Sequence, residues 1–468
     1  MDKPLTVVIL AAGLGTRMRS RMAKVLHRAG GRALVEHVVE TALALTAPQR
    51  TFVVVGHQAE RVRNLLASRG VGFVEQKEQK GTGHALMCGR ESLSGLGGHL
   101  AILYGDCPLI SAQTLRTLVE RQRQSQAAAT LITAVLDDPP AWGRVIHDER
   151  GNVRAIVEQK AATPEQLAIR ELNAGIYCFE ADLFWKHVDE IRPDNPAREY
   201  YLTDMVEILN RAGHTIQSMR IDDAGEVLGI NDRVELAAVD RVLRERKVRE
   251  LMLQGVTIEK PDTVVVDPQV RIGMDTVIEP FAQILGDSVI GEDCRIGACS
   301  ILRDATLGNR VLVGPFTMAA SSCVEDDAHL GPYARLRVDN HVAAGAHIGN
   351  FVELKNTRMG RGSKAMHLAY LGDSAVGEKV NVGAGTITCN YDGAKKHATR
   401  IGDGAFVGSN STLVAPVEIG EGAYLAAGSV ITHPVPSDAL AVGRARQVVK
   451  EGWARRRRRS PAEVVPGG

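Results

Sequence analysis

The first half of the chain alternates short aliphatic runs with segments in which apolar residues recur at helical spacing. The aliphatic runs predict buried strands at residues 7–12, 51–55, 99–105 and 130–135. The helical spacing predicts helices at residues 34–45, 59–68 and 114–124. This alternation is typical of an α/β fold with a mostly parallel sheet. Ligands of such sheets bind beyond the carboxyl ends of the strands, so we expect the site of this half there.

From about residue 262 the pattern changes to one aliphatic residue at every sixth position. The first run is Ile272, Ile278, Ile284, Ile290, Ile296 and Leu302. The spacing returns at Leu330, Leu336, Val342, Ile348 and Leu354, and again at Ile401, Val407, Leu413, Ile419, Leu425 and Ile431. A period of six is typical of a parallel β-helix, and a Gly-rich low-complexity tail would not hold one phase for so long. The phase breaks at residues 355–367 and 388–399, where we expect loops extruded from the β-helix.

The two patterns meet in a charged segment of helical character at residues 232–254. Val239, Val242 and Leu243 supply one apolar face, so we expect a linker helix there. The boundaries that follow are a first domain at residues 1–231, the linker at 232–254 and a β-helix domain at 255–455. A basic, disordered tail is expected at residues 456–468, because five arginines stand in a row at 455–459.

Composition narrows the class of protein. The chain has 468 residues, which predicts two or three domains. Its 56 Lys and Arg balance 55 Asp and Glu, so the whole molecule carries no field that attracts nucleic acid or an anionic membrane. The seven cysteines are scattered and form no CxxC pair, which argues against a disulfide framework and a structural zinc site. No signal peptide is seen and no apolar run approaches the roughly 20 residues of a membrane span, so we expect a cytoplasmic protein.

A glycine-rich turn follows the first predicted strand, where residues 10–18 read LAAGLGTRM. Small residues let backbone N–H groups approach phosphate oxygens, and Arg17 and Lys24 add the positive charge that a triphosphate needs. Asp106 follows the third predicted strand, and a carboxylate in that position suits Mg²⁺, which usually shares its ligands with substrate phosphates. A plain tight turn is the structural alternative for both motifs.

Polar residues gather in the two expected loops of the β-helix. A histidine alone is usually structural or solvated, but His367 stands in the company of Lys355, Lys364, Tyr370, Asn390 and Tyr391. In that company it is a candidate general base for an amine that attacks a thioester, because histidine titrates near neutral pH. Glu353 is a hypothetical orienting partner for it. Candidate clamps for a sugar phosphate are Arg337, Lys355 and Lys396.

Six strings and the hexad array carry a family resemblance. The strings are LAAGLGTRM at 10–18, KVLH at 24–27, EQKGTGHA at 78–85, YGDCPL at 104–109, GSKAMHLAYLGD at 362–373 and GAGTITCNYDG at 383–393. Over residues 4–455 the chain resembles the bifunctional N-acetylglucosamine-1-phosphate uridylyltransferase / glucosamine-1-phosphate acetyltransferases. The resemblance implies a Rossmann-like α/β nucleotidyltransferase domain followed by a left-handed parallel β-helix of hexapeptide repeats, which carries the acetyltransferase.

The implied function is the synthesis of UDP-N-acetylglucosamine, a precursor of peptidoglycan and lipopolysaccharide. Acetyl-CoA acetylates glucosamine-1-phosphate, and UTP then uridylylates N-acetylglucosamine-1-phosphate with release of pyrophosphate. Mg²⁺ is the implied cofactor and acetyl-CoA the co-substrate. The implied partners are these small molecules and two further copies of the chain in a homotrimer built through the β-helix, with neighbouring chains sharing each acetyltransferase site.

The resemblance also implies which residues form the uridylyl site. Those for the nucleotide are Leu10, Ala11, Ala12, Gly13, Lys24, Gln76, Gly81 and Thr82. Those for the sugar phosphate are Tyr104, Gly105, Asp106, Gly143, Glu158, Asn173 and Asn231. Arg17 and Lys24 act in catalysis through the phosphates, and the Mg²⁺ ligands are Asp106 and Asn231. Departures from the commonest pattern at Leu14, Ala23 and Ala174 remove none of these residues.

In the acetyl site the resemblance assigns the role of base to His367. The residues for the sugar phosphate are Arg337, Lys355, Tyr370, Asn381, Asn390, Tyr391 and Lys396. Those for acetyl-CoA are Ala384, Asn390, Tyr391, Ser409, Ala427 and Arg444.

Two other functions stay open at this stage. The chain could be a sugar nucleotidyltransferase whose β-helix is purely structural, or a non-catalytic scaffold that binds sugar nucleotides. Against the scaffold stand Arg17, Lys24, Asp106 and His367, charged or ionisable residues that a retired site has no need to keep. For the arginine run at 455–459 a solvated end is the simplest interpretation, with contact to coenzyme A phosphates or to polyanions as the alternative.

Overall fold

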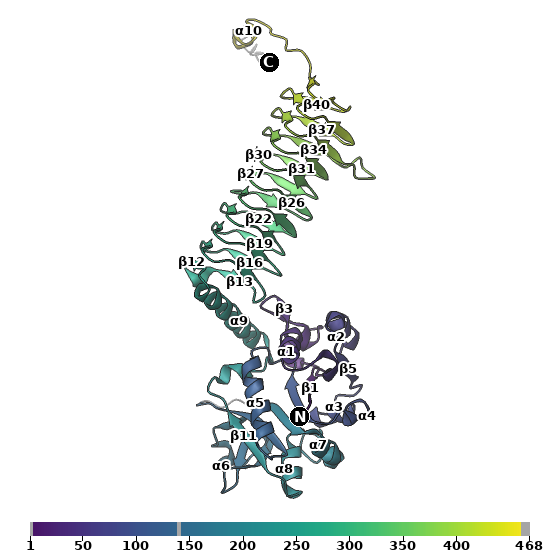
Figure 1. Ribbon diagram of the computed structural model, residues 1–468, viewed down its shortest axis with the longest axis vertical. Helices are drawn as coiled ribbons and strands as arrows, with labels where there is room; N and C mark the ends of the chain where they lie inside the picture. Colours follow the sequence, from purple (N-terminus) through teal and green to yellow (C-terminus); the bar gives the residue numbers. More distant parts are fainter. Residues whose placement is uncertain (1–2, 138–141, 460–468) are drawn as a thin grey trace, which may run out of the picture. The chain divides into compact units, whose positions relative to one another are not determined.

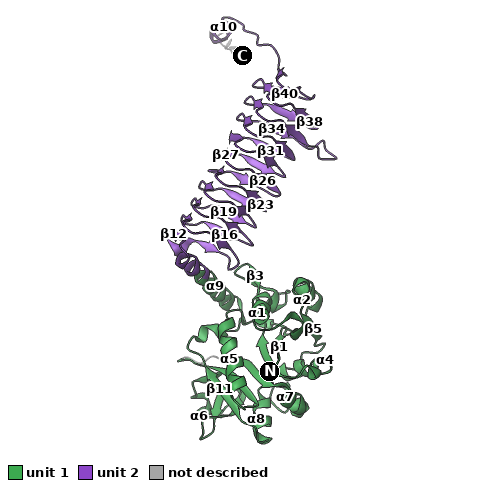
Figure 2. Ribbon diagram, viewed as in Figure 1, with its two compact units in different colours: residues 1–246 green, residues 247–468 purple. Residues whose placement is uncertain are grey.

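A computed structural model describes residues 3–137 and 142–459. The chain divides into two compact units, residues 1–246 and residues 247–468 (Figure 2). Within the described residues, no helix has the length and apolar character needed to cross a membrane.

The first unit is built on a mostly parallel sheet (Figure 1). Its strand order is β11-β7-β10-β6-β1-β4-β5, with the short pair β8 and β9 at the side. The strands are β1 Leu5–Leu10, β4 Thr51–Val55, β5 Gly72–Glu75, β6 His99–Tyr104, β7 Ala129–Val135, β8 Arg144–His147, β9 Val153–Val157, β10 Glu171–Glu180 and β11 Ile216–Arg220. β10 runs antiparallel to β6 and β7, whereas β1 pairs in parallel with β4 and β6. The four predicted strands are confirmed as β1, β4, β6 and β7.

Alternating side chains of the central strand belong to two different cores. Val7 and Ile9 of β1 pack in one hydrophobic cluster, and Val8 and Leu10 in the other. Successive side chains of a strand point to opposite faces, so the sheet is buried on both sides. The helices that cover it are α1 Leu34–Leu43, α2 Ala59–Leu66, α3 Thr82–Met87, α4 Arg90–Leu93, α5 Ala112–Gln124, α7 Ala181–His187 and α8 Asp204–Arg211, whereas the short helix α6 Pro164–Leu167 has no buried residue. The three predicted helices are confirmed as α1, α2 and α5.

The second unit is the predicted parallel β-helix, with three sheets that run along it (Figure 1). The first extends from β12 Thr257–Ile258 to β41 Leu440–Ala441, the second from β13 Val265–Val266 to β40 Val430–Ile431, and the third from β14 Arg271–Ile272 to β38 Val417–Ile419. The aliphatic residues of the three hexad runs are all buried in one continuous cluster. Each coil contributes one strand to each of the three sheets, and each strand places one such residue in the core, which explains the period of six. Each of these residues packs on the equivalent residue of the next coil.

Close stacking leaves little room between coils. A Cβ added to Gly383 would come within 2.5 Å of the backbone nitrogen of Ser409 on the next coil. Glycine at such turns therefore lets the coils approach to hydrogen-bonding distance.

The expectation of an extruded loop at residues 355–367 is wrong. This stretch continues the regular coil through β28 Glu353–Lys355, β29 Arg358–Met359 and β30 Lys364–His367. Arg335 pairs with Glu353 on the next coil, and Glu353 pairs in turn with Tyr370. The coil from Glu353 to Tyr370 is therefore one residue shorter than the coil from Arg335 to Glu353. Such a coil shifts the phase of the hexads without extruding any chain.

The second expected loop, at residues 388–399, is confirmed. Asn381 pairs with Phe406 on the next coil. These two residues are much further apart in the sequence than paired residues of the neighbouring coils, so the additional residues form a loop outside the β-helix. It follows β34 Ile387–Cys389, folds back through a bridge between Tyr391 and Lys396, and returns at β35 Thr399–Ile401.

The predicted linker helix is α9 Arg233–Leu253. Val239 is buried in a small cluster of the first unit, and Val242 and Leu243 pack against that cluster. Val248 and Leu251 near the other end of α9 are buried in the β-helix cluster. A tail at residues 456–468 was expected to be disordered. Its first residues instead belong to a short helix, α10 Trp453–Arg459. Residues 460–468 of that tail lie outside the described part of the chain.

The packing of the hexad core gives a prediction about stability. Replacing the fully buried Ile296 by Ala removes apolar contacts and leaves a cavity, so the free energy of unfolding should fall by about 2–5 kcal/mol. Met274→Ala is the matched control, because Met274 is 55% exposed and its loss should change the value by less than about 0.5 kcal/mol. Urea unfolding followed by far-ultraviolet circular dichroism measures both. Equal effects would contradict the assigned core.

Candidate active sites

A cavity of about 720 Å³ opens at the carboxyl ends of β1 and β6 in the first unit. It is lined by most of the residues that sequence analysis assigned to the nucleotide and its sugar phosphate: Leu10, Ala11, Ala12, Gly13, Lys24, Gln76, Gly81, Thr82, Tyr104, Asp106, Glu158, Asn173 and Asn231. The structure thus brings together residues from both ends of the first unit's sequence. The position agrees with the rule that sheets of this kind bind ligands beyond their strand ends.

The glycine-rich turn shapes one wall of the cavity. Gly15 has a φ of +62°, and a Cβ there would lie 2.6 Å from the Cβ of Lys24. Only glycine combines this backbone conformation with so close an approach. Nothing lies within 4 Å of a Cβ built on Gly13, so the backbone at that point is open to a ligand.

Each cation of the motif contacts a candidate metal ligand. The ammonium of Lys24 forms an ion pair with Asp106, and both side chains are largely buried. Nη2 of Arg17 donates to Oδ1 of Asn231 at 2.7 Å. The backbone N–H of Ile230 donates to the carbonyl of Asp106 at 3.0 Å, which holds the loop of Asn231 beside the end of β6. Two side-chain oxygens from two loops therefore meet near two positive charges.

The side-chain oxygens of Asp106 and Asn231 suit Mg²⁺ better than a metal ion whose ligands all come from the protein. Among the described residues, no group of three or more His, Cys, Asp or Glu side chains could hold a metal ion. Mg²⁺ is commonly bound by one or two protein oxygens, with water and substrate phosphates completing the octahedron. Asp106 and Asn231 fit that donor set.

The part of the cavity where the sugar phosphate is expected is built around partly buried polar groups. The backbone N–H of Asn173 donates to the carbonyl of Gly143 at 2.9 Å, and its Nδ2 donates to the hydroxyl of Tyr177 at 2.7 Å. Burial raises the pKa of Glu158, although a hydrogen bond from Thr203 opposes the shift. Burial also raises the pKa of Tyr104, so its hydroxyl stays a donor at neutral pH.

Three expected residues lie beside the cavity without lining it. Gly105 sits behind the wall, where a Cβ would meet Ala11 at 3.2 Å. Gly143 lies next to Glu158, whose Oε1 would be 3.5 Å from a Cβ at that position. Arg17 reaches the site through its bond to Asn231.

Sequence analysis missed several residues that also line the cavity. They are Gln79, Gln159, Lys160, Glu199, Tyr201 and Thr203. The segment of Tyr201 and Thr203 carries no glycine-rich or metal-binding motif. Only a tertiary contact, the hydrogen bond from Thr203 to Glu158 at 3.2 Å, reveals its place.

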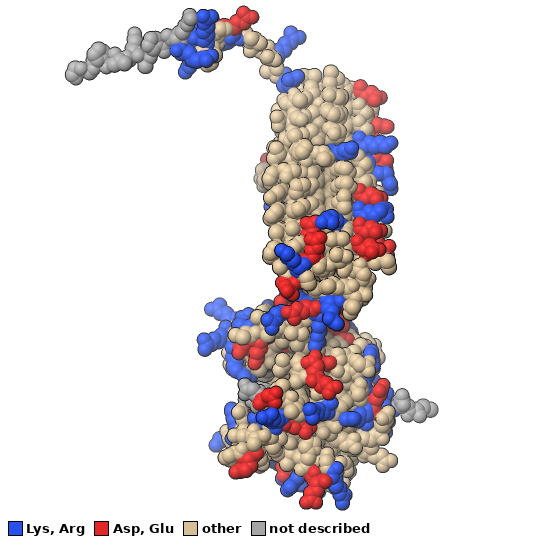
Figure 3. All heavy atoms as spheres, turned by 90° about the vertical axis from the view of Figure 1, so that its left-hand side faces the viewer, with Lys and Arg blue, Asp and Glu red and all other residues tan. Residues whose placement is uncertain are grey.

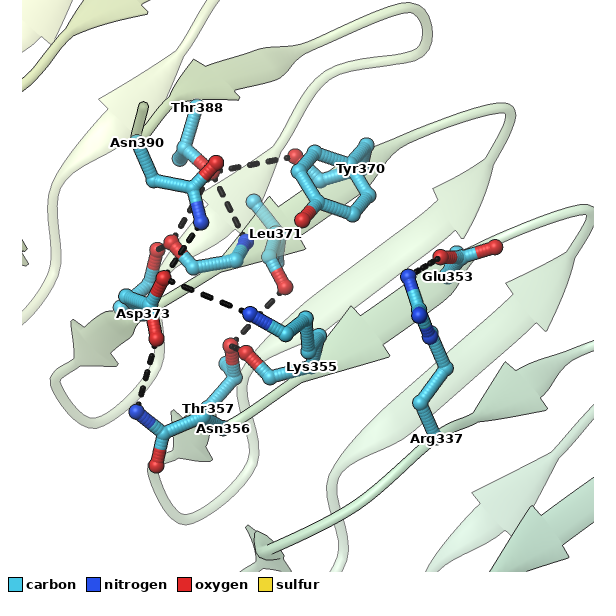
Figure 4. A network of polar contacts seen from close by, with 12 residues as sticks. Arg337, Glu353, Lys355, Asn356, Thr357, Tyr370, Leu371, Asp373, Thr388 and Asn390 are labelled. Atoms are coloured by element: carbon cyan, nitrogen blue, oxygen red, sulfur yellow. Dashed lines mark hydrogen bonds and ion pairs between the residues drawn. The ribbon is translucent and has the colours of Figure 1, made fainter. Parts of the chain in front are cut away.

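A second polar cluster lies on the β-helix (Figure 4). Lys355 ends β28, Tyr370 begins β31 Tyr370–Gly372, and Asn390 follows β34, so all three come from neighbouring strands of one sheet. The ammonium of Lys355 holds the pKa of Lys396 below its ordinary value. Tyr391 is exposed, and its hydroxyl donates to the carbonyl of Gly393 at 2.6 Å.

Asp373, which sequence analysis did not single out, lies at the centre of this cluster (Figure 4). Its carboxylate accepts from Nδ2 of Asn356 at 2.8 Å and from Nδ2 of Asn390 at 2.5 Å, and Nζ of Lys355 lies 3.8 Å away. Burial acts to raise the pKa of Asp373, but these hydrogen bonds and the charges of Lys355 and Lys396 outweigh it and lower the pKa. The signal in the sequence was the equal spacing from Asn356 to Asp373 and from Asp373 to Asn390.

Arg337 stands at the edge of the cluster. Its Nη1 lies 3.2 Å from Oε1 of Glu353, and Arg335 also contacts that carboxylate, at 3.6 Å. Glu353 was considered as an orienting partner for His367, but its carboxylate is engaged by these two arginines instead. Asn381 lies apart from the cluster, since its strand β33 Asn381–Val382 belongs to the first sheet and Lys355 to the second.

His367 and four of the residues assigned to acetyl-CoA, Ala384, Ser409, Ala427 and Arg444, fall in one column along an edge of the β-helix, whereas Asn390 and Tyr391 belong to the polar cluster described above. The backbone N–H of Gly385 donates to the carbonyl of Leu368, so Ala384 follows His367 one coil later. The N–H of Asn410 donates to Ala384 at 2.7 Å, and that of Gly428 donates to Ser409 at 2.8 Å, so Ser409 and Ala427 continue the column. Cδ of Arg444 lies 3.9 Å from a Cβ built on Gly428. A long, thin ligand could follow this edge, with one end at the exposed His367.

Comparisons with known proteins agree with both halves of this description. The model of the MobA-like NTP transferase domain matches residues 7–170, and the bacterial transferase hexapeptide model matches residues 269–304 and 398–433. The bifunctional protein GlmU of Solibacter usitatus is 64% identical, over 98% of this chain and 98% of that relative. The chain belongs to the family of the bifunctional protein GlmU. That of Koribacter versatilis is 49% identical, over 98% of each chain.

The family membership expected from the sequence is therefore confirmed, and with it the pairing of a nucleotidyltransferase with a hexapeptide-repeat acyltransferase. A solved CMP:2-keto-3-deoxy-manno-octonic acid synthetase with CTP matches 52% of this chain and 99% of its own, at 17% identity and a TM-score of 0.40.

The geometry of the glycine-rich turn can be tested directly. Gly15→Ala should lower nucleotidyl transfer at least tenfold, because its Cβ would displace Lys24 and strain the backbone. Acetyl transfer should be unchanged. Gly95→Ala is the control, since a Cβ there meets nothing within 4 Å. Steady-state pyrophosphate release measures the effect, and a Gly15→Ala enzyme with unaltered kinetics would mean that the turn does not set the position of Lys24.

Proposed function

We propose that the chain makes UDP-N-acetylglucosamine in two steps at two separate sites. The β-helix transfers the acetyl group of acetyl-CoA to glucosamine-1-phosphate, and the α/β unit transfers the uridylyl group of UTP to the product. The observation that carries this proposal is that each unit holds its own convergent polar site, while the whole length of the chain matches relatives named for two functions.

In the α/β unit the reaction is an in-line displacement. A phosphate oxygen of N-acetylglucosamine-1-phosphate attacks the α-phosphorus of UTP, and the bond to the β-phosphate breaks to release pyrophosphate. Such a reaction depends on positioning and charge neutralisation, and it uses no protein nucleophile. Arg17 and Lys24 supply positive charge to the triphosphate, on the open wall formed by Gly13.

Asp106 and Asn231 would hold Mg²⁺, which when bound neutralises the charge on the phosphates. Lys24 now contacts Asp106 and Arg17 contacts Asn231. These contacts place the two cations beside the two oxygen ligands, where both can act on the same phosphates.

The other lining residues would select the substrates. Leu10, Ala11, Ala12, Gln76, Gly81 and Thr82 lie where the nucleotide is expected. The sugar phosphate would lie against Tyr104, Glu158 and Asn173, with Gly105 and Gly143 just behind the lining. The hydroxyl of Tyr104 can donate a hydrogen bond to the sugar, and the carboxyl group of Glu158 can accept one from a sugar hydroxyl.

In the β-helix His367 acts as general base. It accepts a proton from the amino group of glucosamine-1-phosphate as the nitrogen attacks the thioester carbonyl. The C–S bond breaks, the amide forms and coenzyme A leaves as its thiol. Acetyl-CoA lies along the column of Ala384, Ser409, Ala427 and Arg444, with Asn390 and Tyr391 nearby. The sugar phosphate is held by Arg337, Lys355, Tyr370, Asn381 and Lys396.

We further infer a homotrimer that forms through the β-helix, with each acetyl site completed by a neighbouring chain. Phe316 stacks on Tyr333 and Tyr333 on Phe351, with ring centroids 5.0 and 5.2 Å apart, yet all three rings are about half exposed. A large part of the β-helix face in Figure 3 carries no charged side chain. Such surfaces are typical of contacts between chains. The separation of Asn381 from Lys355 within one chain also suits a shared site.

In this proposal each activity belongs to one of the domains expected from the sequence. Residues 1–231 carry uridylyl transfer, residues 232–254 connect, residues 255–455 carry acetyl transfer, and residues 456–468 are an accessory basic tail. Small, phosphorylated substrates of this kind occur in the cytoplasm, which is the proposed location.

Two substitutions test the two-site proposal. His367→Ala should reduce acetyl transfer at least a hundredfold and leave uridylyl transfer unchanged, because general-base catalysis contributes about 10²–10⁴-fold. Asp106→Ala should do the reverse. Thiol release and pyrophosphate release, measured separately on the purified variants, read out the two activities.

Loss of both activities in either folded variant would contradict two independent sites. Pyrophosphate release from N-acetylglucosamine-1-phosphate without any thiol release by the parent enzyme would instead favour a nucleotidyltransferase with a structural β-helix.

A further inference from the structure

The carboxylate of Asp373 contacts two residues assigned to the acetyl site, Asn390 and Lys355, and one neighbouring residue, Asn356. It lies 2.5 Å from Nδ2 of Asn390, 3.8 Å from Nζ of Lys355 and 2.8 Å from Nδ2 of Asn356 (Figure 4). The side chains of Asp373 and Lys355 are only 13% and 15% exposed. A partly desolvated carboxylate that accepts bonds from two amides fixes the orientation of both more firmly than a solvated one.

The backbone conformation of Asp373 gives a simpler reason for an aspartate at this position. Asp304, Asp339, Asn356 and Asp373 all adopt a left-handed backbone conformation at corners of the β-helix, with φ between 48° and 52°. Asp and Asn tolerate this conformation better than most residues, so a corner alone would account for an aspartate. Asp339 occupies such a corner two coils earlier and is exposed. The corner does not account for the burial of Asp373 or for its contacts with Lys355 and Asn390.

We propose that Asp373 is a positioning residue of the acetyl site, which holds the amide of Asn390 and the ammonium of Lys355 in the geometry that receives glucosamine-1-phosphate. This inference rests on the proposed acetyltransferase function. With the NH₂ group of Asn390 bound to Asp373, the amide oxygen remains to accept a hydrogen bond from the amino group of the sugar. That acceptor would orient the amine for attack on the thioester.

The proposed role of Asp373 also includes the charge of the neighbouring lysines. The ammonium of Lys355 lowers the pKa of Lys396, whereas the negative charge of Asp373 acts to raise it, with Tyr370 as a further titratable neighbour. Asp373 thereby helps Lys396 to keep its charge and, together with Lys355, to bind the sugar phosphate. Gly372 leaves room for this arrangement, since a Cβ there would lie 2.5 Å from the hydroxyl of Tyr370 and 2.7 Å from Nδ2 of Asn390.

Asp373→Asn tests the proposal, because Asn keeps the size of the side chain and tolerates the corner. It removes the charge and replaces one oxygen by a donor. We expect KM for glucosamine-1-phosphate to rise about tenfold or more, since a bond to a charged group contributes about 1.5–3 kcal/mol. Without Asp373 the pKa of Lys396 falls further, so the rise of KM with increasing pH should begin at lower pH than in the parent enzyme. Uridylyl transfer should be unchanged, and a far-ultraviolet circular dichroism spectrum and urea unfolding curve equal to those of the parent enzyme show that the β-helix is folded.

Asp339→Asn is the matched control, with the same substitution at the same kind of corner and no expected change in KM. If Asp373→Asn left both KM and its pH dependence as in the parent enzyme, Asp373 would be a corner residue only. If it lowered kcat alone and left the pH dependence unmoved, the proposed role in charge would be wrong. Absence of thiol release from the parent enzyme would overturn the proposed function itself, which is a distinguishable result.

Discussion

The register between successive coils of the β-helix is the constraint on which the second unit depends. Buried aliphatic residues stack coil on coil, and any slip of the register by a single position would turn them out of the core. Because the register is fixed, side chains that stand one coil apart in the sequence become neighbours in space. The column from His367 to Ala427 and the contacts of Asp373 with Asn356 and Asn390 follow directly from it. The polar cluster is therefore a consequence of how the aliphatic core stacks.

The first unit positions its site by a different principle. The parallel strands β1 and β6 end at the same edge, so the loops that follow them converge on one cavity. Polar contacts hold the convergence in place, with Lys24 against Asp106 and Arg17 against Asn231. The two sites share only a chemical theme, which is the paired use of cations and oxygen ligands to bind phosphorylated substrates. Each therefore works with the local structure of its own unit.

Periodic features of the sequence predicted most of the fold. The hexads predicted the β-helix, and aliphatic runs predicted β1, β4, β6 and β7, because burial imposes a regular pattern on both. The loop expected at residues 355–367 was wrong because a slightly shortened coil and an insertion both interrupt the phase in the same way. The family resemblance implied most of the residues that line the cavity of the first unit, but Tyr201 and Thr203 were missed because their place depends on tertiary contacts alone. Asp373 was missed for a similar reason, since its partners become visible only when the register between coils is known.

The central claim is that one chain carries both activities and that the product of the β-helix is the substrate of the α/β unit. The most direct measurement supplies the purified protein with glucosamine-1-phosphate, acetyl-CoA, UTP and Mg²⁺ and follows free thiol and pyrophosphate over time. The account predicts that thiol appears first and that pyrophosphate follows after a lag, with none formed when acetyl-CoA is omitted. Pyrophosphate that appears only when N-acetylglucosamine-1-phosphate is added, with no thiol at any time, would contradict it.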